Sequence, residues 1–543
     1  MSEDVSVRWW NTGLCLEEEA HAAAHQCDQL LTVCYCTTKP IGKSRGCTNF
    51  RASFPLPRYR NFYPIFVHIA SIIKHKSLAY RCFFDYNRVV PKRRRIFLLT
   101  IPAGADFILR RLTENGFDAY VVGGCVRDSL LGLFPHDWDI CTSARPEQMQ
   151  AVFADCRVIE TGLKHGTLTV LHNRIPYEVT TFRVDGGYTD HRHPDSVSFV
   201  SNVVDDLARR DFTVNAMAWN PQTGLVDAFH GQEDLRAGII RAVGDPKTRF
   251  TEDALRILRA LRFASVYAFR IDDATSQAAH DLRNTLTDVA AERIRVELAK
   301  LLCGQGAADI LRAYPDVVFV LLPQLRAMHG FDQHNPHHRY DVWEHTLRAL
   351  PHIPPTETLR LAILLHDSGK PDCFTLDEAG IGHMHGHAER SAEIADEVLS
   401  SLRVDNATRE RVTLLVRSHS LSVSPDPKLL RRRLNQLGEE ALRELLLLQR
   451  ADQLGKGTIS PEEIKAEYRA VVAALDALMA TSPCFTLKSL AVSGRDLMAA
   501  GLPKGHIVGQ ALAYLLDEVM AERLPNARDA LLDAAIRQFG GMS

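Results

Sequence analysis

The spacing of the apolar residues changes near Arg249, and this change divides most of the chain into two parts that must fold differently. Before it, from Ile101 on, short runs typical of strands, such as AYVV and YEVTTF, alternate with helical stretches that are interrupted by glycines. After it, nearly every segment repeats its apolar residues at three- and four-residue intervals, as in EDALRILRALRFA. We therefore predict a multidomain chain with an α+β head, built on a small mixed β-sheet with helices, followed by an all-α remainder.

Length and composition narrow the class of protein. The 543 residues are enough for three or four domains of ordinary size. A formal net charge of −2 argues against a generally basic nucleic-acid-binding surface, but it is compatible with a local basic groove. No apolar run approaches the ~20 residues that a membrane helix needs. The twelve cysteines form no CxxC pair and no signal peptide leads the chain, so we expect reduced thiols, no zinc ribbon and a cytoplasmic protein.

Residues 1–98 differ from the rest of the sequence. Aromatic, cysteine and basic residues mix there without a sustained helical or strand period, and the segment ends in PKRRR. Two interpretations remain open: a targeting or partner-binding extension, or a translated upstream region that is not part of the working protein. We favour the second because no targeting pattern is met.

Two aspartates one residue apart stand out in the stretch FPHDWDI, residues 134–140. On a strand, residues i and i+2 share one face, so Asp137 and Asp139 would project together, with Trp138 on the other side. Two like charges at this distance repel each other, and a cation between them is the simplest remedy. The alternative is an ordinary turn, because Pro135 and aspartate are both common turn residues.

The stretch GGCVRD, residues 123–128, precedes these aspartates at a predicted strand-to-helix turn. Gly123 and Gly124 would allow the backbone to approach phosphate oxygens, and Arg127 could add a forked contact. Glu178, on a predicted hairpin strand, is a candidate third carboxylate, or else an ordinary exposed strand residue. Paired carboxylates beside a phosphate-binding turn predict a magnesium–triphosphate site, with room for two ions.

The stretch EDALR carries a possible means of choosing a base. Asp253 and Arg256 are three residues apart, so on a helix they would share a face, one offering acceptors and the other donors. Cytosine and adenine each present an amino donor beside a ring-nitrogen acceptor, which matches this pair. Uracil and guanine present the reverse pattern and would leave the charges badly paired. The alternative is a surface ion pair between the two side chains.

A second set of candidate metal ligands lies on separate predicted helices of the all-α part. This pattern of His, His-Asp and Asp resembles the HD superfamily, whose members bind divalent metals and often hydrolyse phosphate esters. Imidazole and carboxylate ligands suit transition metals such as Ni, Mn or Fe. The four residues are His345, His366, Asp367 and Asp452. His385, His387 and His419 could extend the site towards two metals, although each could equally be an ordinary histidine.

Six motifs, in a fixed order, carry a resemblance to a known family: GGCVRD, HDWDI, KHGTLTV, VDGGYTDHRHP, LARRDFTVNAMA and RFTEDALRILRALRFA. From about Ile101 to Phe539 the chain resembles the class II tRNA nucleotidyltransferase and bacterial poly(A) polymerase family. The resemblance implies that Asp137 and Asp139 bind Mg²⁺ and activate the 3′ hydroxyl of an RNA. It further implies a nucleotide-binding set consisting of Gly123, Gly124, Arg127, Arg210, Asp211, Asn215, Asp253, Arg256 and Arg259.

The same resemblance implies the reaction and its partners. We expect template-independent addition of C, C and A to tRNA 3′ ends from CTP and ATP, with release of pyrophosphate and two-metal catalysis. The polar, glycine-containing stretch DGGYTDHRHP matches the flexible loop that relatives use to change from C to A. The alternatives are an A-adding enzyme or poly(A) polymerase, and a chain that is chiefly an HD phosphohydrolase. No membrane partner is expected.

The resemblance also suggests an order of domains and two further roles. Glu292 and Arg293, on a predicted neck helix, would brace the EDALR helix. Lys488, Arg495 and Lys504 are candidates for phosphate contacts in an RNA-holding tail. The expected organisation is an extension (1–98), a nucleotidyltransferase head (99–240), a helical neck and body (241–333), an HD metal-binding domain (334–460) and a helical tRNA-binding tail (461–543).

Overall fold

The computed structural model describes residues 99–160, 162–163, 166–186, 196–335, 339–481 and 484–540. The interpretations of residues 1–98 lie outside these ranges, as does most of the VDGGYTDHRHP motif. Among the described residues, no helix is both long and apolar enough to cross a membrane.

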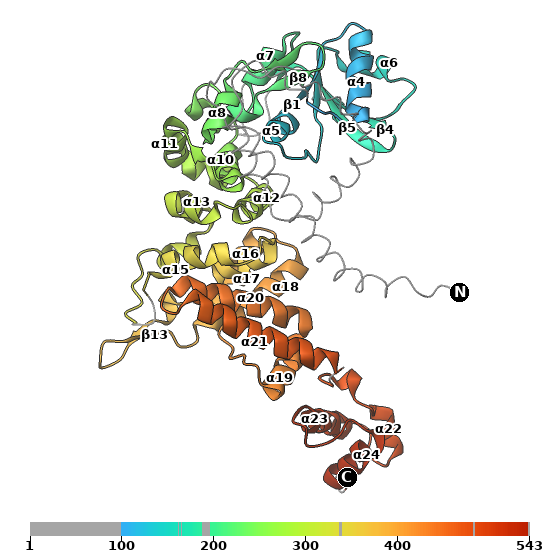
Figure 1. Ribbon diagram of the computed structural model, residues 1–543, viewed down its shortest axis with the longest axis vertical. Coiled ribbons are helices and arrows are strands. Elements are labelled where there is room, and N and C mark those ends of the chain that lie inside the picture. Colours follow the sequence, from blue (N-terminus) through green and yellow to red (C-terminus); the bar gives the residue numbers. More distant parts are fainter. Residues whose placement is uncertain are drawn as a thin grey trace, which may run out of the picture. The chain divides into compact units, whose positions relative to one another are not determined.

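The described part of the head contains a seven-stranded sheet with the order β3-β4-β5-β2-β1-β8-β9. Strands β2 and β5 run parallel and the other neighbours are antiparallel, which confirms the predicted mixed sheet (Figure 1). The strands are β1 (Ala119–Val122), β2 (Ile140–Thr142), β3 (Arg157–Ile159), β4 (Thr167–His172), β5 (Ile175–Thr181), β8 (Ala218–Asn220) and β9 (Gly224–Val226). A separate pair consists of β6 (Arg183–Asp185) and β7 (Val197–Phe199).

Both faces of the central strands are covered, which explains why β1 is apolar throughout. Val121 belongs to a core that includes helix α4 (Ala103–Glu114), whereas Tyr120 and Val122 pack with helix α7 (Val203–Ala208) on the other face. The helices α5 (Gly124–Leu130) and α6 (Pro146–Val152) complete the head. Because successive side chains of a strand point to opposite faces, β1 contributes residues to a hydrophobic core on each side of the sheet.

The predicted hairpin that carries Glu178 is present, formed by β4 and β5, and it determines where Glu178 lies. Asn173 and Arg174 both adopt positive φ, of 51° and 67°, as a two-residue hairpin turn requires. The hairpin pairs Thr169 with Glu178, and the parallel register pairs Ile140 with Val179. Glu178 is therefore placed at the level of the residue that precedes β2.

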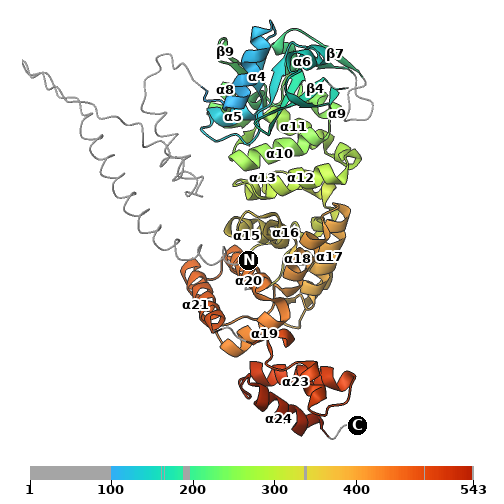
Figure 2. The same ribbon diagram turned by 90° about the vertical axis from the view of Figure 1, so that its right-hand side faces the viewer.

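The remainder is helical, as the apolar period predicts (Figures 1 and 2). The helices are α8 (Gly231–Ala237), α9 (Pro246–Glu252), α10 (Leu255–Tyr267), α11 (Asp273–Leu282), α12 (Ala291–Leu302), α13 (Ala307–Ala313), α14 (Pro315–Leu321), α15 (Val342–Ala349), α16 (Glu357–Leu365), α17 (His387–Ser401), α18 (Asn406–Ser418), α19 (Pro427–Leu437), α20 (Glu439–Lys456), α21 (Pro461–Ala480), α22 (Gly494–Ala499), α23 (His506–Met520) and α24 (Arg528–Phe539). Short strand pairs join β10 (Ile239–Ile240) to β11 (Arg270–Ile271) and β12 (Thr375–Leu376) to β13 (Gly382–His383). Short 3₁₀ helices are η2 (Thr213–Asn215), η3 (Arg283–Asp288), η4 (Pro323–Met328), η5 (Leu350–His352), η6 (Pro371–Cys373) and η7 (Leu487–Ser489).

Three predicted element boundaries are wrong. The stretch HDWDI is not a strand throughout, because β2 begins only at Ile140. The EDALR motif is not one helix, since α9 ends at Glu252 and Asp253 adopts extended angles (φ −144°, ψ 104°) before α10. His366 and Asp367 do not lie in mid-helix, because α16 ends at Leu365 and they form the turn that follows. Each corrected residue stands at the end of an element.

The last three helices have a hydrophobic core of their own. Leu497, Leu515 and Leu531 are fully buried there, in a cluster that extends from Leu490 to Phe539. Helix α21 instead contributes Val471 and Leu475 to the large core that it shares with α20. The segment from Leu490 onward is therefore stabilised mainly by contacts within itself.

This separate core predicts a local effect of mutation. Replacing Leu515 with alanine should destabilise the segment by about 2–5 kcal/mol, because a buried leucine leaves a cavity. Amide hydrogen exchange should then accelerate across α22, α23 and α24 but not in α15 to α20. Met498→Ala, at a position 38% exposed, is the matched control. Acceleration that spreads into α15 to α20 would contradict an independent core.

Candidate functional site

Three carboxylates gather where strand β2 begins. Asp137 and Asp139 face solvent, whereas Trp138 between them packs against the core, so the expected alternation holds although the segment precedes the strand. The Val122 N–H donates to the carbonyl oxygen of Asp139 at 3.0 Å and ties this segment to β1. Crowding by protein atoms, together with the charges of Glu178 and Asp137, raises the pKa of Asp139, although Arg210 opposes the effect. Such mutual repulsion is what a bound cation would relieve.

The Gly123–Gly124 turn lies directly against this carboxylate group. Gly123 has φ 80° and ψ −125°, its N–H donates to the Met217 carbonyl oxygen at 3.0 Å, and helix α5 starts at the next residue. A Cβ atom at Gly123 would come within 2.9 Å of Nη1 of Arg210. Position 123 therefore needs glycine both for its backbone angles and for the close approach of Arg210.

Arg127 is buried rather than open to a ligand. Its Nη1 donates to Oδ1 of Asn215 at 2.5 Å and its Nε donates to Oδ1 of Asp128 at 2.9 Å. The guanidinium also lies 5.0 Å from the ring centres of both Phe263 and Tyr267. These contacts join α5 to η2 and α10, so Arg127 acts in this structure as a support for the site, and its forked phosphate contact stays a prediction.

Asp211, Asn215 and Arg259 form one buried group. Oδ1 of Asp211 accepts a hydrogen bond from Nδ2 of Asn215 at 3.0 Å, and its Oδ2 accepts one from Nε of Arg259 at 2.9 Å. Burial alone would raise the pKa of Asp211, but Arg259 and Asn215 hold it well below its ordinary value. The structure thus brings together three of the residues that the family resemblance assigns to nucleotide binding.

Two supporting carboxylates were missed by the sequence analysis. Asp206 is fully buried and pairs with Arg209 at 2.8 Å and with Arg210 at 3.2 Å. Glu297 on α12 is also buried and lies 3.6 Å from Arg259. The i, i+3 and i, i+4 spacing of Asp206 to the two arginines is a signal that could have identified it. Glu297 shows no comparable local signal.

Asp253 and Arg256 do not pair with each other. Oδ2 of Asp253 accepts a hydrogen bond from Nη2 of Arg293 at 2.9 Å, which agrees with the bracing role expected for Arg293. Arg256 donates to Oε2 of Glu252 at 2.6 Å and to the Arg209 carbonyl oxygen at 3.2 Å. Their mutual surface ion pair, the alternative interpretation, is therefore absent among these contacts. Glu292 does not brace the motif but pairs with Arg403 at 2.6 Å.

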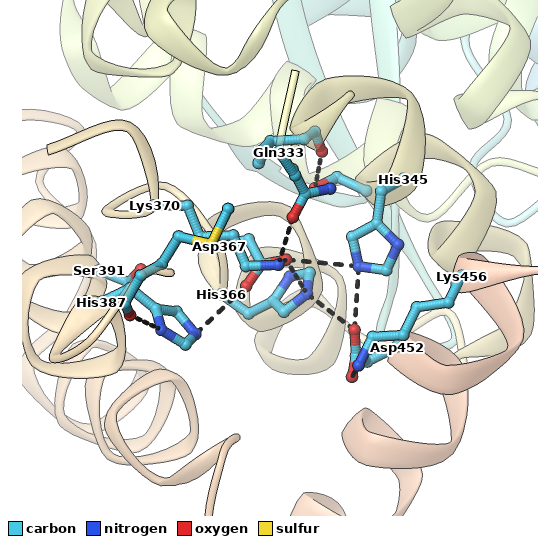
Figure 3. Close-up of polar contacts among 12 residues, drawn as sticks. Gln333, His345, His366, Asp367, Lys370, His387, Ser391, Asp452 and Lys456 are labelled. Atoms are coloured by element: carbon cyan, nitrogen blue, oxygen red, sulfur yellow. Dashed lines mark hydrogen bonds and ion pairs between the residues drawn. The ribbon is translucent and has the colours of Figure 1, made fainter. Parts of the chain in front are cut away.

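The four residues of the second predicted set of metal ligands lie close together in the structure (Figure 3). One ligand atom from each of its four residues lies within 4.8 Å of all the others. Nε2 of His345 is 2.9 Å from Oδ1 of Asp452 and 3.4 Å from Oδ2 of Asp367, and Nε2 of His366 is 3.2 Å from Oδ2 of Asp367. Helix α15, the turn after α16 and helix α20 supply these residues. We call them the His–Asp cluster: His345, His366, Asp367 and Asp452.

The chemistry of the His–Asp cluster suits a divalent metal. The Ile363 carbonyl oxygen accepts a hydrogen bond from Nδ1 of His366 at 2.8 Å, which leaves Nε2 to face the cluster. That Nε2 is buried, as is Oδ2 of Asp367, whose charge is paired with Nζ of Lys370 at 2.7 Å. Burial lowers the pKa of His366, but Asp367 and Asp452 outweigh it and raise the pKa to about 9. A metal ion would satisfy both buried atoms at once.

Lysines and further histidines surround the cluster. Nζ of Lys370 lies 2.7 Å from Oδ2 of Asp367, and Nζ of Lys456 lies 3.0 Å from Oδ2 of Asp452. Nε2 of His387 and Nε2 of His419 lie 3.7 and 3.5 Å from Oδ1 of Asp367, whereas His385 stacks on His383. A cavity of about 630 Å³ opens onto Asp367, Asp452 and both lysines.

The basic residues proposed for the tail are all exposed. Lys488 lies in η7, Arg495 lies in α22, and Lys504 precedes α23. Exposed basic side chains are free to contact the phosphates of an RNA, and this role stays a prediction.

Comparison with known families finds three separate matches along the chain. The family of the poly A polymerase head domain matches residues 119–241. The family described as a probable RNA- and SrmB-binding site of polymerase A matches residues 268–314. The family of putative tRNA nucleotidyltransferase domain 2 matches residues 383–535.

Individual relatives cover most of the chain. The CCA-adding enzyme of Limosilactobacillus fermentum is 34% identical over 440 residues, which is 80% of this chain and 98% of that protein. The CCA-adding enzyme of Leuconostoc mesenteroides is 49% identical over 220 residues, covering 40% of this chain and 54% of that protein. The crystal structure of the Bacillus stearothermophilus CCA-adding enzyme in complex with CTP superposes with a TM-score of 0.61 at 29% identity, covering 80% of this chain and 96% of that one. The chain therefore belongs to the CCA-adding enzyme family of tRNA nucleotidyltransferases.

Proposed function

We propose that this chain adds C, C and A to the 3′ end of tRNA, using CTP and ATP and releasing pyrophosphate. The observation that carries the proposal is the group of Asp137, Asp139 and Glu178 beside the Gly123 turn. The chain that holds this group matches 98% of the length of a CCA-adding enzyme. A tRNA substrate also leads us to propose that the protein acts in the cytoplasm.

The three carboxylates would hold Mg²⁺, since hard divalent cations prefer oxygen ligands. When bound, Mg²⁺ would neutralise charge on the triphosphate and stabilise the negative charge that develops on the attacking 3′ oxygen. The Gly123–Gly124 turn would admit the triphosphate close to the backbone. Arg210, held by Asp206 at 3.2 Å, would face the phosphates from the other side of Gly123.

Base selection would rest on Asp253 and Arg256. Arg293 holds the carboxylate of Asp253, while Glu252 and the Arg209 carbonyl oxygen hold the guanidinium of Arg256. Two separately held groups lose little conformational freedom when a base binds, which favours selectivity. Their acceptor and donor edges match cytosine and adenine and oppose uracil and guanine.

Three tRNA transcripts, ending before CCA, after C and after CC, test the reaction. With Mg²⁺ and each labelled nucleotide separately, we expect C on the first two transcripts, A on the third, and no use of UTP or GTP. Asp137→Asn should lower kcat by at least about 100-fold, because a charge that stabilises the transition state is lost.

Glu147→Gln, an exposed carboxylate on α6, is the matched control and should change kcat little. Addition of A alone, or long A tails, would assign the chain to the A-adding enzymes or poly(A) polymerases instead. No addition by a folded sample would refute the role of the head.

Asp253→Asn tests the selection of bases. The amide can donate where the carboxylate only accepts, so discrimination of CTP against UTP should fall by about 10-fold or more. The measurement is the ratio of kcat/KM for the two nucleotides on the transcript ending before CCA. Asp281→Asn on α11, whose carboxylate pairs with Lys247 outside the motif, serves as control. An unchanged ratio would exclude Asp253 from base selection.

We further propose that the His–Asp cluster is an HD-type site for a divalent transition metal such as Ni, Mn or Fe. The convergence of the four ligand atoms, among them the buried Nε2 of His366, favours this second role. When bound, the metal would act as a Lewis acid towards a phosphate ester. His345, His366, Asp367 and Asp452 would hold it, while Lys370 and Lys456 hold the two carboxylates in place.

His345→Ala should abolish any hydrolysis of bis(p-nitrophenyl) phosphate that depends on added Mn²⁺ or Ni²⁺, since one of the ligands is lost. CCA addition by the same variant should persist, because the head carries that reaction. His506→Ala, an exposed histidine at the start of α23, is the control. Full phosphodiesterase activity in a folded His345→Ala protein would place that activity elsewhere.

A further inference from the structure

Phe134 is the most exposed large hydrophobic side chain among the residues that the structure describes. It is 82% exposed, whereas Leu376 and Ile175, which follow it, are 56% and 54% exposed. Single apolar side chains on a surface are common and need no function. Phe134 differs because it lies three residues before Asp137, the first of the three carboxylates at the head site. Chain geometry keeps the Cα atoms of these two residues within about 11 Å of each other.

The backbone before Phe134 is fixed by the end of helix α5. Gly132 has φ 73°, and its N–H donates to the Ser129 carbonyl oxygen at 3.1 Å. The N–H of Leu133 donates to the Asp128 carbonyl oxygen at 2.8 Å. These two hydrogen bonds form the Schellman pattern, which ends a helix with a glycine in the left-handed region. The side chain of Leu133 packs against the core and anchors the turn.

The turn is also attached to the helix that carries Arg256. Oδ1 of Asp128 accepts a hydrogen bond from the Tyr267 hydroxyl at 2.9 Å, and Tyr267 is the last residue of α10. The start of the segment that presents Phe134 is therefore tied to the helix on which we place base selection.

The backbone after Phe134 is restricted as well. Pro135 disfavours helical angles at the residue before it and fixes its own φ. Trp138 packs against the core, and the Asp139 carbonyl oxygen accepts a hydrogen bond from the Val122 N–H at 3.0 Å. The exposed ring therefore stands on a short segment that is held at both ends. Such a ring loses little conformational freedom when it binds a partner.

The proposed reaction brings an unpaired RNA end to this part of the head. The 3′ hydroxyl of the tRNA would lie at the Mg²⁺ held by Asp137 and Asp139, so the last bases of the strand come within reach of Phe134. Bases at single-stranded RNA ends stack on aromatic side chains. Stacking accepts any base, because every base has a flat π face. That tolerance is needed here, because the terminal base of the tRNA changes with the additions.

We propose that Phe134 is a stacking platform for the unpaired 3′ end of the tRNA, and that its ring holds the terminal base while the 3′ hydroxyl meets the carboxylates. This inference rests on the proposed addition of CCA and deepens it by naming a contact for the RNA strand. The choice of the incoming nucleotide is a separate task, which we assign to Asp253 and Arg256. Phe134 therefore contributes to RNA affinity and not to nucleotide selection.

The affinity of the full chain for RNA with and without an unpaired end tests the proposal. Filter binding without nucleotide compares a tRNA transcript ending after CC with one trimmed to the last base pair of the acceptor stem. Phe134→Ala should weaken binding of the first transcript about 10-fold, because a base loses its stacking partner, and should leave binding of the second unchanged. Phe134→Tyr, which keeps an aromatic ring, should bind both transcripts as the parent does. Phe134→Leu keeps an apolar side chain without a flat ring and should resemble Phe134→Ala.

Kinetics supply a second readout. With ATP and the transcript ending after CC, Phe134→Ala should raise the KM for the transcript about 10-fold and leave the KM for ATP unchanged. Ile175→Ala, at an exposed position on β5, is the matched control and should change neither value. Because the ring of Phe134 is exposed, the circular dichroism spectrum and the Tm of each variant should match those of the parent.

Several results would overturn the stacking role. Equal affinity of the parent and Phe134→Ala for the transcript ending after CC would remove the contact altogether. An equal loss on both transcripts would place the contact on the paired stem, and a raised KM for ATP alone would place the ring against the incoming nucleotide.

The binding assay needs no catalysis, so it separates this inference from the proposed function. A parent chain that adds no nucleotide, but whose RNA affinity falls in Phe134→Ala as expected, would refute the proposed function and retain the stacking role. A chain that adds CCA and binds RNA equally well with and without the ring would do the reverse. A folded parent chain that binds neither transcript would overturn both.

Discussion

The buried carboxylate of Asp211 is the interaction on which the arrangement of the nucleotide-binding residues depends. It accepts hydrogen bonds from Asn215 and from Arg259, at 3.0 and 2.9 Å. Asn215 in turn accepts from Arg127 on α5, and Arg259 reaches Glu297 on α12 at 3.6 Å. Leaving such a buried charge without its partner costs about 3–5 kcal/mol, so the group behaves as one unit. It ties η2 of the head to α10, the helix that carries Arg256.

Like charges are placed close together at both candidate sites, but their surroundings differ. In the head, Asp137, Asp139 and Glu178 face solvent, so substrate and metal can arrive together and leave together. In the His–Asp cluster the ligands are buried, and Lys370 lies 2.7 Å from Asp367. Burial alone would raise the pKa of Asp367, but His366 and Lys370 hold it well below its ordinary value. This difference in exposure accords with the two proposals, in which the first site turns over a charged substrate and the second retains an ion.

Much of the fold could be predicted because its signals are local. Alternating and helical apolar periods indicated the mixed sheet, the hairpin at Asn173 and the long helical remainder. The break at Asp253 could not be predicted, since Ala254 and Leu255 favour a helix and the break is held by Arg293, forty residues away. The buried position of Arg127 could not be predicted for a similar reason, because its partners Asn215, Phe263 and Tyr267 are remote in sequence.

The sequence by itself determined the order of the motifs, the identity of the candidate ligands and the class of fold, because these depend on residue type and spacing. Only the tertiary structure decided which side chains meet. Asp367 faces His345 and His366 with one oxygen and His387 and His419 with the other, because four separate helix segments converge on it. Spacing along a chain specifies which residues share an element, but packing between elements determines the distances at which their atoms can share a metal ion.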